Sequence, residues 1–282
     1  MKKTEIGIFC GDRRHVYLAK LFLQKGYPVT VYRLPETMQG DGCITALSLE
    51  ELTQRCPLLI GPIPFTNDSK QTVLSLPGLL NSSHFLVGGI IPPELTDLCE
   101  DRKIPYYDLM KNEKIAILNS VATAEGSIME AILTSDKNLH GSSCLVMGYG
   151  RCARTLAEKL KGLDAIVTVA ARSEAALAFA QASGFRGIPL SDKDGLADFD
   201  FIFNTIPALV LDQDRLALLK QEAVIIDISS APGGIDYGYA KQRGLKVKLC
   251  SGLPGKISPK SSADILADEI ILLMRKEKFH ES

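Results

Sequence analysis

The chain of 282 residues is 46% hydrophobic and 23% charged, proportions that are typical of a folded globular protein and exclude a disordered one. Its 32 Lys and Arg residues balance 33 Asp and Glu residues, so a net charge of −1 leaves no bulk positive field for nucleic acid or an anionic membrane. No apolar run reaches the roughly 18 residues of a membrane helix, and the apolar stretch 6–10 is too short for a secretory signal.

The first elements predict a strand, a tight turn, a helix and a second strand. Residues 6–10 are continuously apolar, residues 15–25 have helical spacing, and residues 28–32 form the next strand. The apolar stretches 58–64 and 85–89 end in Gly and Pro turns, like further strands of the same sheet. Continuously apolar strands are typical of parallel sheets with helices on both faces, so we expect a doubly wound first domain.

The turn of this first unit reads Gly11-Asp12-Arg13-Arg14. It lacks the second glycine that would let a pyrophosphate approach the backbone. Arg13 and Arg14 stand at the positive end of a predicted helix, where a small anion binds well. We predict that both bind a carboxylate of the substrate; the alternative is a solvated helix start.

The middle of the chain predicts a linker helix over residues 121–137, with Thr123 as a possible N-cap. Asn119 and Thr123 lie where the chain crosses between the two halves, the usual position of a substrate cleft, and we predict that both bind substrate. Glu125 either caps this helix or acts as a general acid–base.

The second half repeats the order of elements. After the apolar strand 143–147, residues 148–153 have the pattern G-x-G-x-x-A, and a helix and the strand 165–170 follow. This pattern between a strand and a helix is the fingerprint of a dinucleotide site, in which backbone N–H groups at the helix N-terminus hold the pyrophosphate. The alternative is a glycine-rich turn without a ligand.

The end of the strand 165–170 bears on the choice between NAD and NADP. An NAD site usually places a carboxylate there for the ribose 2′-hydroxyl, but this chain has Arg172 and Ser173. A guanidinium and a hydroxyl suit a 2′-phosphate, so we predict NADP rather than NAD. The alternative is a solvated strand end.

Two later strands end in polar turns, at the edge where open α/β sheets bind ligands. The first turn is Asn204-Thr205-Ile206-Pro207, and the second begins at Asp227. The residues predicted to bind the cofactor are therefore Gly148, Tyr149, Gly150, Arg151, Cys152, Arg172, Ser173, Asn204, Thr205, Ile206, Pro207 and Asp227. Lys256, in a Pro/Gly loop before the last helix, is a candidate for neutralising a substrate carboxylate or for a catalytic role; the alternative is a solvated loop lysine.

These patterns predict an α/β protein with two doubly wound, Rossmann-like parallel-sheet domains joined by linker helices. Residues 1–120 form the substrate domain, completed by a C-terminal helix at 262–282, and residues 138–261 form the NADP-binding domain. The seven cysteines include no C-x-x-C pair, which predicts reduced thiols in a cytoplasmic protein. The four histidines have no ligand spacing, so no metal site is predicted.

The ordered set of motifs resembles the A subunits of dipicolinate synthase over nearly the whole chain. The segments that carry the resemblance are 11–14, 61–64, Asn119, 122–126, 148–151, 204–208, 232–234 and 253–256. Cys152 stands where relatives often have glycine. The resemblance implies oxidation of a dihydrodipicolinate-type dicarboxylate with a nicotinamide cofactor, partnership with a flavoprotein-like B subunit, and the mother-cell cytoplasm during sporulation.

Two other functions remain open beside this resemblance. One is a different dehydrogenase, of the shikimate or 2-hydroxyacid type, although no Lys–Asp or His–Glu pair is evident. The other is a non-catalytic NADP-binding protein that regulates its partner. A homo-oligomer is also compatible with the sequence.

Overall fold

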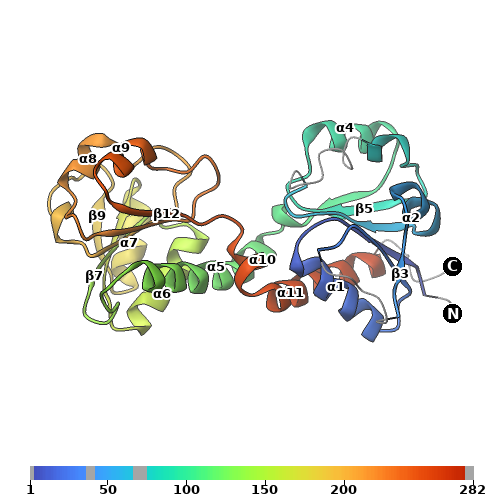
Figure 1. Cartoon of the computed structure of the whole chain (residues 1–282), viewed down its shortest axis with the longest axis horizontal. Coiled ribbons are helices and arrows are strands. Elements are labelled where there is room, and N and C mark those ends of the chain that lie inside the picture. Colours follow the sequence, from blue (N-terminus) through green and yellow to red (C-terminus); the bar gives the residue numbers. More distant parts are fainter. Residues whose placement is uncertain (1–2, 36–41, 66–74, 277–282) are drawn as a thin grey trace. The chain divides into compact units, whose positions relative to one another are not determined.

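The computed structural model describes residues 3–35, 42–65 and 75–276. The chain divides into two compact units (Figure 1). The first comprises Met1–Leu118 and Ser258–Ser282, and the second comprises Asn119–Ile257. Each unit contains a parallel six-stranded sheet flanked by helices, which confirms the predicted α/β fold class.

The first unit is built on six short strands. They are β1 (Ile6–Phe9), β2 (Val29–Tyr32), β3 (Ile44–Thr45), β4 (Leu58–Ile60), β5 (Phe85–Gly88) and β6 (Tyr106–Asp108). Its helical elements are α1 (Arg13–Gln24), α2 (Leu49–Arg55), η1 (Leu76–Gly78), α4 (Pro93–Asp101), η2 (Leu109–Lys111), the start of α5 (Glu113–Thr134) and α11 (Pro259–Lys276). The strands pair in the order β3-β2-β1-β4-β5-β6, the order of a doubly wound fold.

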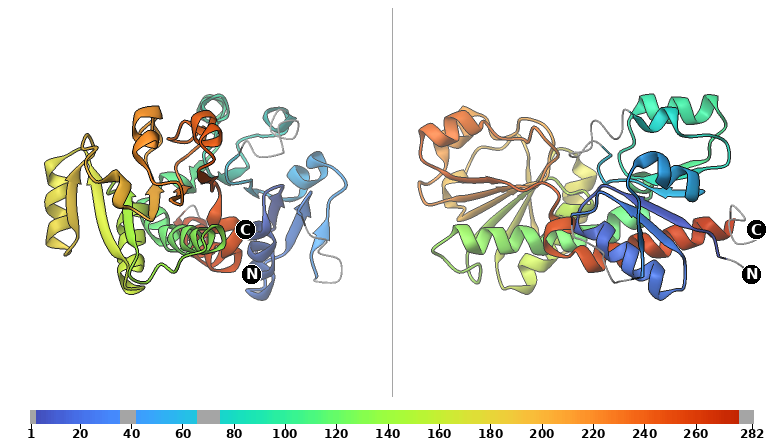
Figure 2. Two further views of the ribbon diagram at one scale, coloured as in Figure 1. Left: turned by 60° about the vertical axis from the view of Figure 1, so that its left-hand side comes forward. Right: turned by 45° about the vertical axis from the view of Figure 1, so that its right-hand side comes forward.

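Helices pack on both faces of this first sheet, and both faces carry buried apolar side chains. Ile6 and Ile8 pack with α1 and α11, and α11 lies directly against α1 (Figure 2). Phe9 and Leu59 pack on the opposite face with α2 and α4. The C-terminal helix therefore contributes to the core of the first unit.

The second unit repeats the architecture. Its strands are β7 (Ser143–Met147), β8 (Ile166–Ala171), β9 (Arg186–Pro189), β10 (Phe201–Asn204), β11 (Val224–Asp227) and β12 (Lys246–Leu249). Its helical elements are the rest of α5, α6 (Arg151–Gly162), α7 (Glu174–Ala182), η3 (Leu196–Asp198), α8 (Gln213–Leu218), α9 (Tyr237–Gln242) and α10 (Leu253–Ile257). The order β12-β11-β10-β7-β8-β9 is again doubly wound. Helices α5, α6 and α7 contribute to the core on one face, and α8 and α9 to the core on the other.

The structure corrects the predicted ends of two helices. The linker helix was expected over residues 121–137, but α5 begins at Glu113 and ends at Thr134. Thr123 is therefore not an N-cap; it lies inside the helix, where its Oγ1 donates to the carbonyl of Asn119 at 3.1 Å. The C-terminal helix α11 begins at Pro259, and the predicted residues 277–282 lie outside the described part of the chain.

Helix α5 is also the one described helix that is long and apolar enough to cross a membrane by length and composition alone. Half of its most apolar window is buried inside the protein, as in the core helix of a folded domain. Its length and composition therefore carry little weight for a membrane span.

Candidate functional site

The turn between β7 and α6 has the geometry that a dinucleotide site requires. Gly148 has a φ of +97°, and a Cβ there would lie 2.4 Å from Thr205 Oγ1, so this position needs glycine for the turn itself. Gly150 is different, because a Cβ there would meet no described atom within 4 Å. No side chain caps α6, which begins directly after Gly150. The helix N-terminus therefore faces space that an anion can fill.

The other residues of this turn differ in how far they are buried. Tyr149 is buried, its ring lies edge-on to Phe185 with centroids 6.5 Å apart, and the Arg154 guanidinium lies over it at 5.1 Å. Arg151 is exposed as the first residue of α6. Cys152 is half-buried, and burial raises the pKa of its thiol.

The end of β8 carries the two residues predicted to select the cofactor. Arg172 is exposed directly after the strand. Ser173 is the N-cap of α7, and its Oγ accepts from the Ala176 amide at 3.2 Å. The sequence did not predict this capping role. The cap uses the Ser173 oxygen only as an acceptor, so the hydroxyl can still donate to a ligand.

The turns after β10 and β11 come together through their side chains. Asn204 and Asp227 are opposite each other in the parallel register, and both are fully buried. Asn204 Nδ2 donates to Asp227 Oδ1 and to the Ile206 carbonyl, at 3.0 Å each, while its Oδ1 accepts from the Ile206 amide. Both N–H groups of the Asn204 side chain are therefore used within the protein, not for the cofactor contact that the sequence predicted.

Thr205, Ile206 and Pro207 extend this turn beyond the sheet. Thr205 Oγ1 donates to the carbonyl of Met147 at 2.9 Å, which ties the end of β10 to the end of β7. Ile206 is half-buried and Pro207 is exposed. The glycine turn after β7 and the turn after β10 thus lie side by side at one edge of the second sheet.

The turn between β1 and α1 in the first unit gives Arg14 a different role from the predicted one. Its side chain is only 6% exposed and is bound to Asp12, with Nε 2.9 Å from Oδ1 and Nη2 2.7 Å from Oδ2. A further hydrogen bond from Nη2 reaches the Ile63 carbonyl at 2.7 Å. Arg14 therefore has a structural role, because its guanidinium connects Asp12 to the turn after β4.

Asp12 and His15 close the same helix start. Asp12 is the N-cap of α1 and forms a capping box with His15, which is fully buried and lies 3.0 Å from the Gly61 carbonyl through Nε2. Burial opposes ionisation of Asp12, but hydrogen bonding with His15 and Arg14 outweighs it and holds the pKa of this carboxyl far below its ordinary value. The anion at this helix N-terminus is Asp12 itself. Arg13, by contrast, is exposed.

The remaining residues that were predicted to bind substrate or to act in catalysis differ in burial and in hydrogen bonding. Asn119 is buried, and its Oδ1 has no hydrogen-bond partner among the described residues. Glu125 is exposed within α5 and pairs with Lys159 of α6 at 2.9 Å, so its predicted alternative as a helix cap is wrong. Lys256 is exposed on the short helix α10.

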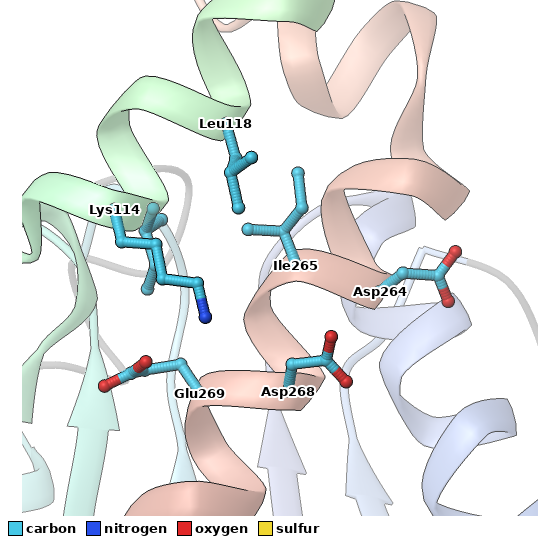
Figure 3. A pocket seen from close by; sticks show the side chains of 7 residues that line it. Lys114, Leu118, Asp264, Ile265, Asp268 and Glu269 are labelled. Atoms are coloured by element: carbon cyan, nitrogen blue, oxygen red, sulfur yellow. The ribbon is translucent and has the colours of Figure 1, made fainter.

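A pocket of about 120 Å³ lies in the first unit between α5 and α11 (Figure 3). Lys114 extends toward Asp268 and Glu269 in it, and Asp264 also lines it. Glu269 is buried and accepts from the Tyr107 hydroxyl at 3.3 Å. Three carboxylates against one lysine make this pocket a poor receptor for a dianionic substrate.

Sequence reasoning missed several residues that organise these turns. The capping box of Asp12 and His15 has a readable spacing of three residues, which could have shown that the helix start is filled. Tyr237, which donates to Asp227 at 2.6 Å, follows it by ten residues and has no sequence signal. No group of His, Cys, Asp or Glu suited to a metal ion occurs in the ranges 3–35, 42–65 and 75–276.

Comparison with known proteins identifies the family. A model of the N-terminal domain of dipicolinate synthase A subunits matches residues 5–110. Over 290 aligned residues, the chain is 36% identical to the dipicolinate synthase A subunit of Bacillus subtilis strain 168, and the match covers 98% of each protein. The chain belongs to the family of dipicolinate synthase A subunits.

Solved structures agree with membership of the dipicolinate synthase family. The crystal structure of the A subunit from Bacillus halodurans superposes with a TM-score of 0.87 and 29% identity, covering 97% of this chain and 99% of that one. The corresponding structure from Bacillus subtilis gives a TM-score of 0.83 at 29% identity, with 98% and 97% covered. D-lactate dehydrogenase from Escherichia coli, at 14% identity and a TM-score of 0.66, covers 98% of each chain and shares the fold.

The second unit of this dipicolinate synthase family member has its own match. Residues 114–233 match the model of the NAD-binding domain of D-isomer specific 2-hydroxyacid dehydrogenases. That range includes the glycine turn and the strands β7 to β11. A dinucleotide-binding domain is therefore present, and the chain is an oxidoreductase.

Proposed function

We propose that this chain oxidises a dihydrodipicolinate-type dicarboxylate with NADP⁺ as the A subunit of a dipicolinate synthase. In this reaction the dihydropyridine ring loses a hydride to the cofactor and a proton to solvent, and the products are dipicolinate and NADPH. The observation that carries the proposal is the uncapped start of α6 beside Gly150, in a chain 36% identical to a dipicolinate synthase A subunit.

The residues of the second unit fit a dinucleotide. The open space at Gly150 lets a pyrophosphate reach the backbone N–H groups of the first turn of α6, whose partial positive charge favours it. A bound nicotinamide dinucleotide supplies the hydride acceptor. Arg151, exposed at the same helix start, adds a positive charge there.

The preference for NADP rests on Arg172 and Ser173. Neither residue is a carboxylate, and the exposed Arg172 guanidinium suits bidentate contact with a 2′-phosphate. Ser173 can donate its hydroxyl hydrogen while its oxygen continues to cap α7. An NAD site would favour an acceptor for the 2′-hydroxyl at this strand end instead.

The substrate side uses cations and two polar residues. Arg13 and Lys256 are exposed and are the proposed partners of the substrate carboxylates, while Arg14 supports the turn that carries Arg13. Asn119, whose buried Oδ1 has no hydrogen-bond partner among the described residues, remains a proposed substrate-binding residue together with Thr123, whose Oγ1 donates to the Asn119 carbonyl. Because the ring becomes aromatic, hydride loss is favourable and needs no strong catalytic base; alignment of the reacting carbon is the main requirement.

The proposed setting follows from the family. We infer that the chain acts in the mother-cell cytoplasm during sporulation, together with a flavoprotein-like B subunit. All seven cysteines are thiols rather than disulfides, which is compatible with a reducing compartment.

The test is NADPH formation from dihydrodipicolinate by the purified chain, first alone and then with the B subunit, with dipicolinate measured in the same samples. We expect both products in equal amounts. No turnover in either mixture would overturn the proposal. Dipicolinate without NADPH, formed only when both proteins are present, would instead support a regulatory NADP-binding role for this chain.

Cofactor choice is tested by Arg172→Asp. We expect the variant to lose its preference for NADP over NAD, whereas Arg186→Asp should keep it. Arg186 is the matched control because it is also exposed but lies at the amino end of β9, away from the ligand edge of the sheet. An unchanged preference in Arg172→Asp would refute the assignment.

A further inference from the structure

The carboxylate of Asp227 accepts hydrogen bonds from five donors at the ligand edge of the second unit. Its Oδ1 accepts from Asn204 Nδ2 at 3.0 Å, from the Ser229 amide at 2.9 Å and from Ser229 Oγ at 2.7 Å. Its Oδ2 accepts from the Gly234 amide at 2.8 Å and from the Tyr237 hydroxyl at 2.6 Å. Since Asp227 is also 0% exposed, it does not reach a ligand directly.

These five hydrogen bonds join three segments of the chain. Asn204 ends β10, Ser229 and Gly234 belong to the loop after β11, and Tyr237 is the first residue of α9. Burial, followed by the hydrogen bond to Asp227, raises the pKa of the Tyr237 hydroxyl, so this phenol remains a donor at neutral pH.

The loop after β11 is in turn packed onto the loop after β10. A Cβ on Gly234 would lie 2.4 Å from Asn204 Nδ2 and 2.6 Å from the Ile206 carbonyl, so only glycine fits there. The amides of Val210 and Leu211 both donate to the Gly234 carbonyl, at 2.9 and 3.0 Å. The two loops therefore form one connected shelf, which we define as residues 204–211 and 228–234.

The shelf lies on one side of the turn between β7 and α6, and β8 lies on the other side. The sheet order places β10 next to β7 and β11 next to β10, while β8 is on the other side of β7. Neighbouring strands are about 4.8 Å apart, so β11 is about 10 Å from β7. If the pyrophosphate lies at the turn after β7 and the adenosine ribose at the end of β8, the nicotinamide half extends over β10 and β11.

We propose that Asp227 is the positioning residue for the nicotinamide half of the cofactor site. It holds the shelf in place through Asn204, Ser229, Gly234 and Tyr237 and contacts no ligand itself. This inference rests on the proposed function for the location of the pyrophosphate. It replaces the direct cofactor contact that the sequence predicts for Asp227.

The test compares two ligands that differ only in the nicotinamide. Binding of NADP⁺ and of 2′-phospho-ADP-ribose, which lacks the nicotinamide ring, is measured by calorimetry for Tyr237→Phe and for Ser229→Ala. Each variant removes one hydrogen bond from a different oxygen of Asp227. We expect each to weaken NADP⁺ binding about 10-fold and to change binding of 2′-phospho-ADP-ribose less than about twofold.

Tyr239→Phe is the matched control, because Tyr239 is on the same helix but is not among the five donors to Asp227. It should leave both affinities unchanged. Equal losses for the two ligands would mean a merely structural role and would overturn the inference, as would unchanged affinities in both test variants. Failure of the unaltered chain to bind either ligand would overturn the proposed function as well, so the two failures are distinguishable.

Discussion

Arg14 and Asp12 form a bidentate ion pair across the first turn of α1, with Nη2 2.7 Å from Oδ2. Arg14→Ala leaves Asp12 without its cation and the Ile63 carbonyl without this donor. We expect a loss of about 1–3 kcal/mol in the free energy of unfolding, measured by urea denaturation, because charge-assisted hydrogen bonds of a buried side chain are removed.

Arg13→Ala is the control for this change. Arg13 is exposed, so its removal should alter the free energy of unfolding by less than about 0.5 kcal/mol. It should instead raise the KM for the dicarboxylate about 10-fold. If both variants lose the same stability, the distinction between a structural and a ligand-binding arginine is wrong.

The hydrogen bonds of the Asp200 carboxylate in the second unit should make the stability of the protein sensitive to acid. Burial raises its pKa, but hydrogen bonds from Lys137, Lys220 and the Ser143 amide prevail and lower it from 3.8 to about 2. A lowered folded-state pKa adds stability above pH 3.8, and this stability is lost as the pH falls toward 2. Asp200→Asn should therefore unfold with a weaker dependence on pH between these values, measured by urea denaturation at several pH values.

Asp214→Asn is the comparison for Asp200. Asp214 pairs with Lys193 but is 78% exposed, so its pair contributes little to stability. The Asp214→Asn variant should show the same pH dependence of the free energy of unfolding as the unaltered chain. If both variants showed an equally weakened pH dependence of the free energy of unfolding, the assignment of this dependence to Asp200 would be wrong.

Gly150→Ala separates cofactor binding from folding. The variant has room for its Cβ and a negative φ of −80°, so the free energy of unfolding should stay within about 1 kcal/mol. The same methyl group occupies the space proposed for the pyrophosphate. We expect NADP⁺ affinity, measured by calorimetry, to fall by at least about 10-fold, which corresponds to the loss of one charge-assisted hydrogen bond. Full affinity would argue against a pyrophosphate at the start of α6.

Gly148→Ala should instead lose stability by more than about 1 kcal/mol, because its φ is +97° and its Cβ would collide with Thr205. Urea denaturation measures this loss. Equal stabilities of the Gly148 and Gly150 variants would show that the turn tolerates a side chain at both positions, contrary to the geometry.

Glu125→Gln tests whether the reaction needs a general base. Because Glu125 is exposed and paired with Lys159, we expect kcat to change less than about twofold over the whole pH profile. A decrease of about 100-fold, with loss of one limb of the profile, would instead assign the acid–base role to Glu125.

The fold could be predicted from the sequence because strand, glycine turn and helix recur in both halves with continuously apolar strands. The same local reasoning failed at Arg14. Two arginines at a helix start suggest an anion site, but Asp12 is only two residues from Arg14 and satisfies both the helix and the guanidinium. A count of basic residues in the sequence therefore overestimates how many of them can bind a ligand.

The side chains at the ligand edge were less predictable for another reason. Asn204 and Asp227 are 23 residues apart, and only the parallel register of β10 and β11 makes them neighbours. Either residue alone is suited to a cofactor contact, but as a buried pair they use each other's hydrogen bonds. Such pairing depends on tertiary structure, as does the contact of Thr205 with Met147.

The cysteine at the start of α6 offers a chemical footprint of the site. Of the seven thiols, only Cys43 and Cys152 are not buried, so a thiol reagent can reach few positions in the folded protein. Cys152 is the second residue after Gly150, and burial raises the pKa of its thiol, which favours the less reactive protonated form. Protection of Cys152 by NADP⁺, with Cys43 as the internal reference, would show that a dinucleotide covers that turn. Thiol modification of the unaltered chain, followed by mass spectrometry, therefore tests cofactor occupancy without an engineered probe.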